Sequence, residues 1–462
     1  MVFHGLTVNK KYSQSKEISK LPRFISEYLI AKNSDRDGTL SEEALKRISR
    51  FIYEYYPDHK DKEFIKYQAM QMGSVKVLDE FTVVTDVTYS TNNVIIPVMG
   101  LRDVRIRTGI LLEHENLLRG GMWGISKIVW DPETEPKIPN HPRNLLVDEF
   151  TPFQVSRCDL QNFIDKRESF TTHEWIEFLI NTIGLNPDMY DRDNELILLS
   201  RLIPLVEPNV NMVELGPKGT GKTFLLRNIS YYSRIISGGN VSPAVLFYHL
   251  VTKTPGLLAV KDLVVFDEIS KIRFKNPDEV MGKLKDYMES GNYERGRQQV
   301  HADSSVVLVG NLPISRGRPR DKILFEVLPV TMRDTAFLDR MHGFIPGWEL
   351  PRIQKSDLHL SQDFGLVGDY FCEILHRFRA LDFQTILSSR VDFSPEVELR
   401  DEKAILKTAS GLIKLVYPTL MFSESELKEI LDIAVKYRQT IVDQLHLMDP
   451  EFIDKKLSYS LH

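Results

Sequence analysis

One stretch near the middle of the chain limits its fold more than any other. It reads VELGPKGTGKTFLLRN, from Val213 to Asn228, and its residues Gly216 to Thr223 match the pattern G-x-x-x-x-G-K-[ST] in full. Glycines let backbone N–H groups approach phosphate oxygens, and the N-terminus of a following helix adds a favourable dipole. We therefore predict a buried strand, a phosphate-binding loop and a helix, which together indicate an α/β fold.

The loop also supplies candidate ligands for a nucleotide. Lys222 is placed to reach the β- and γ-phosphates, and the Thr223 hydroxyl is placed to bind Mg²⁺. We expect ATP and Mg²⁺ as the cofactors. The predicted nucleotide-binding residues of the loop are Gly216, Pro217, Lys218, Gly219, Thr220, Gly221, Lys222 and Thr223.

A second apolar segment, LVVFDEIS, follows the loop and reads as a strand that ends in Asp267 and Glu268. Parallel sheets bind ligands at the carboxyl ends of their strands, so we expect this acidic pair beside the phosphate loop. Asp267 is predicted to hold Mg²⁺ through water, and Glu268 to polarise the attacking water.

Two further positions complete a predicted hydrolytic site. The segment SSVVLVGNLP indicates a buried strand that ends in Asn311, whose amide can orient the lytic water. The segment TAFLDRMHGFIPGW places Arg340 behind an apolar helix, from which an arginine can enter a neighbouring subunit's site and neutralise transition-state charge. The alternatives are a turn-forming Asn311 and a surface ion pair between Arg340 and Asp339.

Composition narrows the class of protein. The chain has 462 residues, enough for two to four domains, and 59 Lys+Arg against 64 Asp+Glu give a net charge of −5. This balance excludes a globally basic nucleic-acid coat but leaves room for a local basic surface. The two cysteines, Cys158 and Cys372, are far apart, and no apolar run is long enough to cross a bilayer. We expect a cytoplasmic protein without a membrane partner.

Changes in hydrophobic period divide the chain into four predicted parts. Residues 1–72 are predicted to be helical, and residues 73–155 are predicted to form a β-rich, candidate DNA-binding domain with an OB-like barrel. Residues 156–350, where strands and helices alternate, are predicted to form the α/β core. Residues 351–462 are predicted to form a helical lid.

The order of these motifs resembles that of the AAA+ superfamily of ATPases. The segment YMESGNYERGRQQVHADSSVVLVGN resembles the MCM helicases, in which a β-hairpin, here about Gly291 to Asp303, precedes the strand that ends in Asn311. FLDRMHGFIPGW resembles the corresponding stretch of Lon ATPase domains. LRDEKAILKTASGLIKLVYP resembles the MCM lid segment that carries sensor 2, which implies that role for Arg400.

The combination of ELGPKGTGKT, FDEIS, DYMESGNYERGR, FLDRMHGFIPGWELP and GGMWG resembles the Lon-like BrxL family of BREX phage-defence systems. The resemblance implies a homo-oligomeric ring, a hexamer or two stacked hexamers, that binds double-stranded DNA and hydrolyses ATP during phage restriction, together with other BREX components. Long members of that family carry a Lon-protease-like domain after the lid. Because this chain stops at His462, we expect a short form without proteolytic activity.

Four arginines are candidate DNA contacts. Arg295 and Arg297 are expected to project from the hairpin toward a central pore, where contacts to phosphates follow a duplex without reading bases. Arg105 and Arg107 alternate on one strand of the β-rich part and are placed to line a nucleic-acid surface. The alternative for each of them is a solvated charge or a contact between subunits.

Two other functions remain open at this point. The first is a protein-remodelling unfoldase. An aromatic-hydrophobic pore loop would favour an unfoldase, whereas the arginines of the hairpin favour a protein that acts on DNA. The second is a DNA-bound scaffold in which ATP sets assembly and little is hydrolysed. The intact pair of Asp267 and Glu268 argues against the scaffold.

Overall fold

The computed structural model describes residues 2–15, 18–35, 38–87, 90–131, 144–153, 158–251, 253–353 and 358–462. The chain divides into two compact units. The barrel unit comprises Gly5–Cys158 and Val367–Tyr370, and the sheet unit comprises Met1–His4, Asp159–Leu366 and Phe371–His462. The predicted boundary between residues 155 and 156 lies outside the described residues, and the four-part division stays a prediction.

In the barrel unit, three helices precede the longer strands, as the change of hydrophobic period predicts. Its helices are α1 (Arg23–Asn33), α2 (Glu42–Tyr55), α3 (Lys62–Met72), α4 (Thr108–Glu113) and α5 (Asn116–Arg119). Its longer strands are β2 (Ser74–Asp86), β3 (Thr91–Ile96), β4 (Leu101–Ile106), β5 (Met122–Trp130) and β6 (Leu145–Pro152), and β1 (Thr7–Asn9) is a short strand near the N-terminus.

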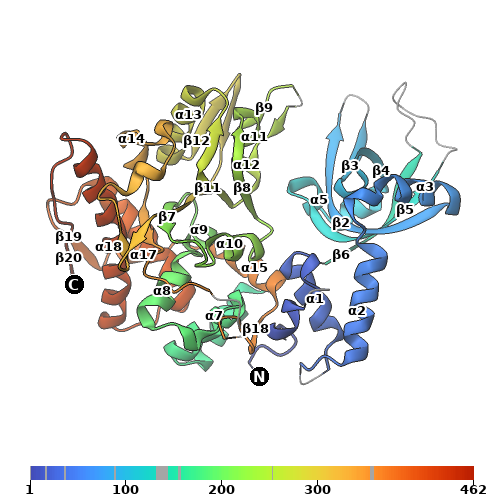
Figure 1. Ribbon diagram of the computed structural model, residues 1–462, viewed down its shortest axis with the longest axis horizontal. Helices are drawn as coiled ribbons and strands as arrows, with labels where there is room; N and C mark the ends of the chain where they lie inside the picture. The colour runs from blue at the N-terminus through green and yellow to red at the C-terminus, as the bar shows by residue number, and fades with distance from the viewer. Residues whose placement is uncertain are drawn as a thin grey trace. The chain divides into compact units, whose positions relative to one another are not determined.

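The five longer strands close into a barrel in the order β2-β3-β4-β6-β5 (Figure 1). β4 and β6 pair in parallel, and the other neighbours pair antiparallel. Along β5, buried and partly exposed residues alternate, as expected for a strand with one face toward a core. Phe81, Met99, Leu117 and Val147 lie in that core.

The sheet unit alternates helices and strands. The elements up to the phosphate loop are α6 (Leu160–Lys166), α7 (Thr172–Ile183), α8 (Arg192–Ser200), α9 (Ile203–Val206) and β7 (Asn211–Gly216). Those from the loop to the acidic strand are α10 (Lys222–Asn228), β8 (Ser233–Val241), α11 (Pro243–Leu246), β9 (Tyr248–His249), β10 (Thr254–Pro255), α12 (Leu257–Val260) and β11 (Leu263–Phe274). They are followed by α13 (Pro277–Ser290), β12 (Asn292–Arg295), β13 (Gln298–His301), β14 (Ser305–Asn311), β15 (Ile314–Ser315), β16 (Arg318–Pro319), α14 (Thr335–Leu338) and β17 (Gly343–Pro346).

Five of these strands form a parallel sheet in the order β17-β7-β14-β11-β8. β7 is buried along its whole length and β14 up to its last residue, which explains their near-continuous apolar sequences. β14 lies between β7 and β11, so the strand that ends in Asn311 separates the phosphate loop from the acidic strand. The prediction of a parallel α/β sheet is confirmed.

The helix after the phosphate loop is shorter than its sequence indicates. The apolar pattern of TFLLRNISYYSR predicts a helix over its whole length, but α10 ends at Asn228 and β8 begins at Ser233. The tyrosines in between bind elsewhere: the Tyr231 and Tyr232 hydroxyls both donate to the Glu373 carboxylate of the later helix α15. This part of the prediction is wrong because tertiary contacts outweigh helix periodicity here.

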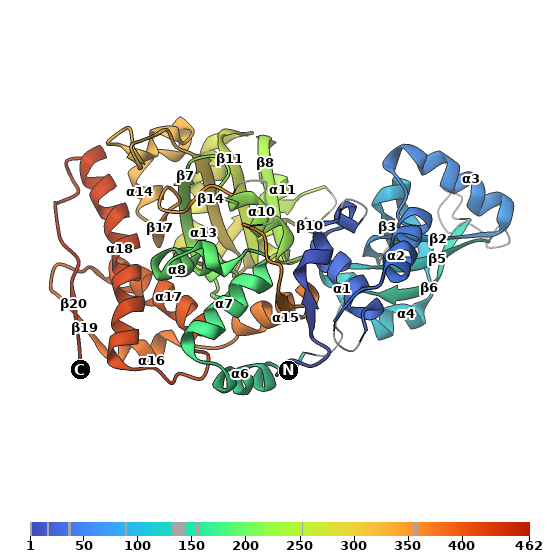
Figure 2. The same ribbon diagram turned by 60° about the horizontal axis from the view of Figure 1, so that its bottom comes forward.

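The part of the chain that follows the parallel sheet is mainly helical but is interrupted by short strands, and the first three residues of its helix α15 are assigned to the barrel unit. Its elements are β18 (Phe364–Leu366), α15 (Gly368–Phe378), α16 (Gln384–Ser388), β19 (Val391–Phe393), α17 (Leu399–Val416), α18 (Glu424–Met448) and β20 (Tyr459–Leu461). α17 packs against α18, and β19 pairs antiparallel with β20 (Figure 2). No helix in the described part of the chain is long and apolar enough to cross a membrane.

Candidate functional site

The phosphate loop connects β7 to α10 at the carboxyl end of the sheet. Gly219 and Gly221 have left-handed φ angles of 89° and 77°, which side chains with a Cβ rarely adopt. The loop also lies close to other backbone, since a Cβ at Gly216 would be 2.5 Å from the carbonyl carbon of Gly347. The loop therefore needs glycine at 219 and 221 for the backbone conformation, and at 216 for close packing against Gly347.

Lys222 begins α10, and its side chain turns back into the loop. Its Nζ donates to the carbonyl oxygens of Pro217 and Gly216, at 2.6 and 3.3 Å, and lies 3.4 Å from the Thr220 hydroxyl. Burial lowers the pKa of Lys222, an effect that the Glu214 carboxylate opposes and the Arg201 guanidinium reinforces. A phosphate group in the loop would favour the charged form of this amine.

Asp267 collects hydroxyl groups from two neighbouring elements. Its Oδ1 accepts from the Thr223 hydroxyl at 2.9 Å, and its Oδ2 accepts from the Ser237 hydroxyl at 3.2 Å. Mg²⁺ binds through hard oxygen ligands, commonly one or two carboxylates together with substrate phosphates. The paired Thr223 hydroxyl and Asp267 carboxylate beside the phosphate loop fit that ion, so the residues that the sequence assigns to Mg²⁺ are brought together.

Glu268 lies in an irregular part of its strand and not at the end of it. β11 runs on to Phe274, so the prediction that the strand ends at the two acids is wrong. The pairing of β11 with β8 shifts register between Asp267 and Ile272, and Glu268 has a left-handed φ of 47°. Such an irregularity changes the direction of a side chain. It explains why Asp267 binds the hydroxyls of Thr223 and Ser237, whereas the adjacent Glu268 pairs with Lys271. Lys271, 2.8 Å away, lowers the pKa of Glu268 by a hydrogen bond and by its charge.

Asn311 ends β14 directly beside the loop. It pairs in register with Gly216 of β7, and the next residue, Leu312, donates its N–H to the Gly216 carbonyl at 3.0 Å. Its side chain is exposed at this edge of the sheet. The structure thus places Asn311 next to the phosphate loop, and its role in orienting water stays a prediction.

A buried ion pair beneath the loop was not anticipated from the sequence. Arg201 and Glu214 are each about 1% exposed, with 2.6 Å between Nη2 and Oε1. Arg201 also donates through Nη1 to the Thr220 carbonyl of the phosphate loop at 3.0 Å. The available signal was Glu214 itself, because a carboxylate inside an apolar central strand requires a buried partner.

Replacing Arg201 by methionine is expected to lower the free energy of unfolding by about 3–5 kcal/mol, since it leaves the Glu214 charge buried without its partner. It should also weaken ATP binding, because the Thr220 carbonyl loses its donor. Adding Glu214→Gln should recover stability without recovering ATP affinity. Urea unfolding and a fluorescent-ATP titration measure the two effects.

The matched control is Lys414→Met, which breaks another buried pair, with Glu207. The Glu207 carbonyl accepts from the hydroxyl of Ser305, the first residue of β14, so this pair lies at the opposite end of the strands from the loop. It should reduce stability and leave ATP affinity unchanged. Equal loss of ATP affinity in both variants would show that Arg201 acts only through stability.

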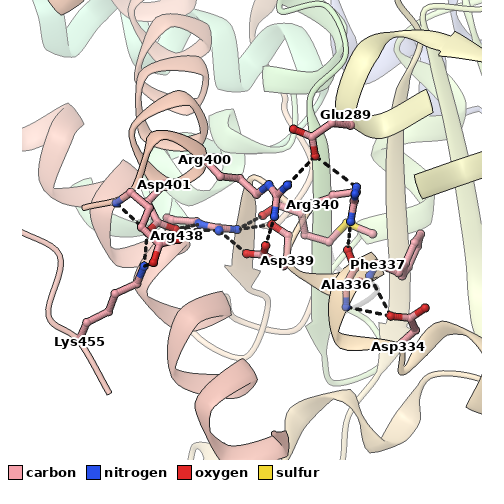
Figure 3. A network of polar contacts seen from close by, with 12 residues as sticks. Glu289, Asp334, Ala336, Phe337, Asp339, Arg340, Arg400, Asp401, Arg438 and Lys455 are labelled. Atoms are coloured by element: carbon pink, nitrogen blue, oxygen red, sulfur yellow. Dashed lines mark hydrogen bonds and ion pairs between the residues drawn. The ribbon is translucent and has the colours of Figure 1, made fainter. Parts of the chain in front are cut away.

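Arg340 and Arg400 converge on one carboxylate, although they come from different parts of the chain. Figure 3 shows both side chains directed at Glu289, at the end of α13. The distances to Oε2 are 3.3 Å from Arg340 Nε and 2.8 Å from Arg400 Nη2. Arg400 also pairs with Asp339, and Arg340 donates to the Ala336 carbonyl.

The two arginines line a small pocket of their own. Among the described residues, those around it come from α13, from the segment between α14 and β17 and from α17 and α18, and none belongs to the phosphate loop. The surface ion pair between Arg340 and Asp339 that the sequence left open does not form; Asp339 binds Arg400 and Arg438 instead. The structure groups Arg340 with Arg400 and keeps this pair separate from Lys222.

The predicted hairpin is confirmed as β12 and β13, but its two arginines differ. Arg295 pairs with Glu279 at 3.3 Å, donates to the Tyr248 carbonyl of β9 and is 14% exposed. The expectation that it projects toward a pore is therefore wrong: it fastens the hairpin to the body of the unit, and Figure 1 shows β12 and β9 at the same end of the sheet. Arg297, in the turn, is exposed as expected.

The arginines of the barrel are both paired. Arg105 lies 2.9 Å from Asp131, and Arg107 binds Asp148 while its side chain stays 60% exposed. Arg105 belongs to β4, whereas Arg107 follows the end of that strand. The interpretation as a bare basic strand face is thereby corrected, because an acidic partner neutralises each charge.

Comparison with known proteins gives concordant results over nearly the whole chain. The family model for the ATPase domain of Lon-like protease BrxL-like proteins matches residues 145–458. The model for the N-terminal part of the BREX system Lon protease-like protein BrxL matches residues 1–130.

Two curated relatives bear the name Lon-like protease BrxL. The protein of Bacillus cereus strain H3081.97 is 32% identical over 464 residues, which cover 99% of this chain and 68% of the relative. The protein of Escherichia coli O9:H4 strain HS is 31% identical over 461 residues, which cover 99% of this chain and 65% of the relative. With its phosphate loop, acidic strand and parallel sheet, the chain belongs to the BrxL family of Lon-like BREX proteins and contains the family's ATPase domain.

Proposed function

We propose that the chain assembles into a ring, hydrolyses ATP between neighbouring subunits and acts on double-stranded DNA in BREX phage defence. One observation carries the subunit-sharing part: Arg340 and Arg400 share Glu289 in a pocket to which the phosphate loop contributes no described residue. Two cations gathered away from the subunit's own loop are suited to a triphosphate held by the next subunit. A hexamer, single or stacked in two rings, provides such interfaces by head-to-tail contacts.

Within one subunit, the residues divide the work of hydrolysis. The loop from Gly216 to Thr223 binds the phosphates through its N–H groups and Lys222, and Thr223 and Asp267 would hold Mg²⁺. When bound, this ion neutralises charge on the β- and γ-phosphate oxygens. Glu268 accepts a proton from the attacking water, which Asn311 orients.

The next subunit supplies the remaining charge. Arg340 is the candidate arginine finger, and Arg400 would bind the same γ-phosphate from the side. Both exchange the Glu289 carboxylate for phosphate oxygens, which accept hydrogen bonds from guanidinium groups in the same planar geometry.

DNA binding rests on fewer residues. Arg297 is exposed at the hairpin turn, where a ring could present one such arginine per subunit to a phosphate backbone. The closed five-stranded barrel also supports an OB-like assignment, since OB folds are five-stranded barrels that bind oligonucleotides over their second and third strands. In this barrel those strands are β3 and β4.

The DNA part is tested by measuring duplex affinity at several salt concentrations, with electron-microscope images of the same samples in ATP. We expect rings around the duplex and an affinity that falls with salt, with a log–log slope of about −0.9 for each phosphate contacted. Arg297→Ala should reduce that slope by roughly one per contributing subunit. Lys428→Ala, which removes an exposed charge from α18, should leave it unchanged. Salt-independent binding would contradict a phosphate-following pore.

One observation favours the alternative of a protein-remodelling motor. Leu250 and Val251, between β9 and β10, are 50% and 86% exposed. Leu250 lies against the hairpin turn, because a Cβ at Gly296 would be 2.9 Å from its Cδ2. Apolar side chains in that place suit an unfolded polypeptide better than phosphates. Stimulation of ATP turnover by an unfolded protein, and not by duplex DNA, would establish this alternative.

A further inference from the structure

One buried arginine of the last long helix, α18, is linked by hydrogen bonds to the surroundings of both Arg340 and Arg400. Arg438, on α18, is about 1% exposed. Its Nη1 donates to the carbonyl oxygens of Asp339 and Met341, at 2.8 and 2.7 Å. These two residues flank Arg340 in the chain, so a single guanidinium binds the backbone on either side of the finger.

The same side chain also orients the partner of the second arginine. Arg438 Nη2 donates to Asp339 Oδ1 at 2.7 Å, while Asp339 Oδ2 binds Arg400. Figure 3 shows the resulting sequence of contacts from Arg438 through Asp339 to Arg400 and Glu289. Asp339 uses one carboxylate oxygen for each arginine. The bond to the buried Arg438 therefore fixes the orientation of the carboxylate, and its other oxygen is left facing Arg400.

The segment that carries Arg340 has little regular structure to hold it. It connects α14, which ends at Leu338, with β17, which begins at Gly343. Asp401 completes the support, since it accepts from Arg438 Nε at 2.7 Å and binds Lys455 at 2.7 Å. A buried charge is tolerated only when it is paired and hydrogen-bonded, and Arg438 has partners for Nε, Nη1 and Nη2.

We infer that Arg438 is a positioning residue for hydrolysis: its guanidinium fixes the turn that carries Arg340 and the carboxylate that directs Arg400 toward a neighbour's nucleotide. This inference rests on the proposed function, because it needs a site shared between subunits. On this inference, α18 supports the arginine finger although it contributes no residue to the phosphate loop. The sequence signal was an arginine on the apolar face of α18, between Ala434 and Ile441 at helical spacing.

Arg438→Lys is the informative change, because lysine keeps the positive charge but cannot donate in a fork to two carbonyls and a carboxylate. A misplacement of about 1 Å is worth roughly a hundredfold in rate, so we expect turnover to fall about a hundredfold. ATP affinity should not change, since the subunit's own loop is intact. Fluorescent-ATP titration and phosphate release measure the two quantities.

Mixed rings separate a positioning role from a structural one. Subunits with Arg438→Lys keep a working loop but present misplaced arginines, and subunits with Glu268→Gln keep the arginines but lack the base. We expect each variant alone to be nearly inactive and an equal mixture to recover about a quarter of wild-type turnover, the share of interfaces that random head-to-tail assembly makes competent. Arg340→Ala mixed with Glu268→Gln is the reference, and Arg438→Lys mixed with Arg340→Ala should stay inactive.

The outcomes distinguish the two proposals. Recovery in the reference mixture without recovery in the Arg438→Lys mixture overturns the positioning role, as does wild-type turnover by Arg438→Lys alone. Failure of the reference mixture, in rings shown to contain both subunits, overturns the shared site and with it the role of Arg438. Leu427→Ala, which truncates a buried side chain on the same helix and destabilises the fold, controls for lost stability and should keep its turnover.

Discussion

Alanine in place of Arg340 is expected to lower ATP turnover by the assembled protein on the order of 10³-fold or more, the range for arginine fingers. The reason is electrostatic: a guanidinium that neutralises charge on the transferring phosphoryl group acts mainly in the transition state. ATP affinity should change little, because Arg340 lies outside the loop that binds the nucleotide. Steady-state phosphate release, with assembly followed by light scattering, measures the effect.

Arg333→Ala, which changes an arginine just before α14, is the matched control. Arg333 donates to the Leu328 and Glu326 carbonyls at 2.9 and 2.7 Å, and it does not line the pocket of Arg340. Its loss should alter stability and leave turnover within a few-fold. Unchanged turnover of Arg340→Ala in persisting rings would remove the finger assignment and leave Arg340 as a partner of Glu289.

Glu268→Gln is the second change with a large expected effect, a fall in turnover of about 10²–10⁴-fold with ATP binding retained. An amide has nearly the shape of a carboxylate but cannot accept the proton of the attacking water. The lowered pKa of Glu268, caused by Lys271, keeps the native side chain ionised at neutral pH. Single-turnover hydrolysis of pre-bound ATP isolates this chemical step from binding.

Glu294→Gln, which changes an exposed carboxylate on the hairpin, is the control and should keep wild-type turnover. The comparison also tests the scaffold alternative. If the unmodified protein turns over ATP no faster than Glu268→Gln, with and without DNA, ATP serves assembly alone. A difference of the expected size rejects that alternative.

The elements that carry the nucleotide residues could be predicted because their signals are local. β7 and β14 are apolar runs of strand length, as strands buried in a parallel sheet must be. The loop pattern requires left-handed backbone at Gly219 and Gly221, which few residues other than glycine adopt. For these elements, residue type and spacing already contain most of the structural information.

The predictions that failed depend on partners far away in the sequence. The helix after the loop ends early because Tyr231 and Tyr232 bind Glu373 of α15. Arg295 looked like a free cation, but Glu279 and the backbone of β9 bind it. Arg105 and Arg107 each meet an aspartate from another part of the barrel.

The sequence by itself determined the phosphate loop, the acids, the asparagine strand, the hairpin and the family resemblance, since each is a pattern of neighbouring residues with its own backbone and charge requirements. Only the tertiary structure decided that β14 separates the loop from the acids, that Arg201 supports the loop, and that Arg340, Arg400 and Arg438 form one network. The physical reason is that a buried charge must be paired, and its partner is selected by packing and not by proximity along the chain.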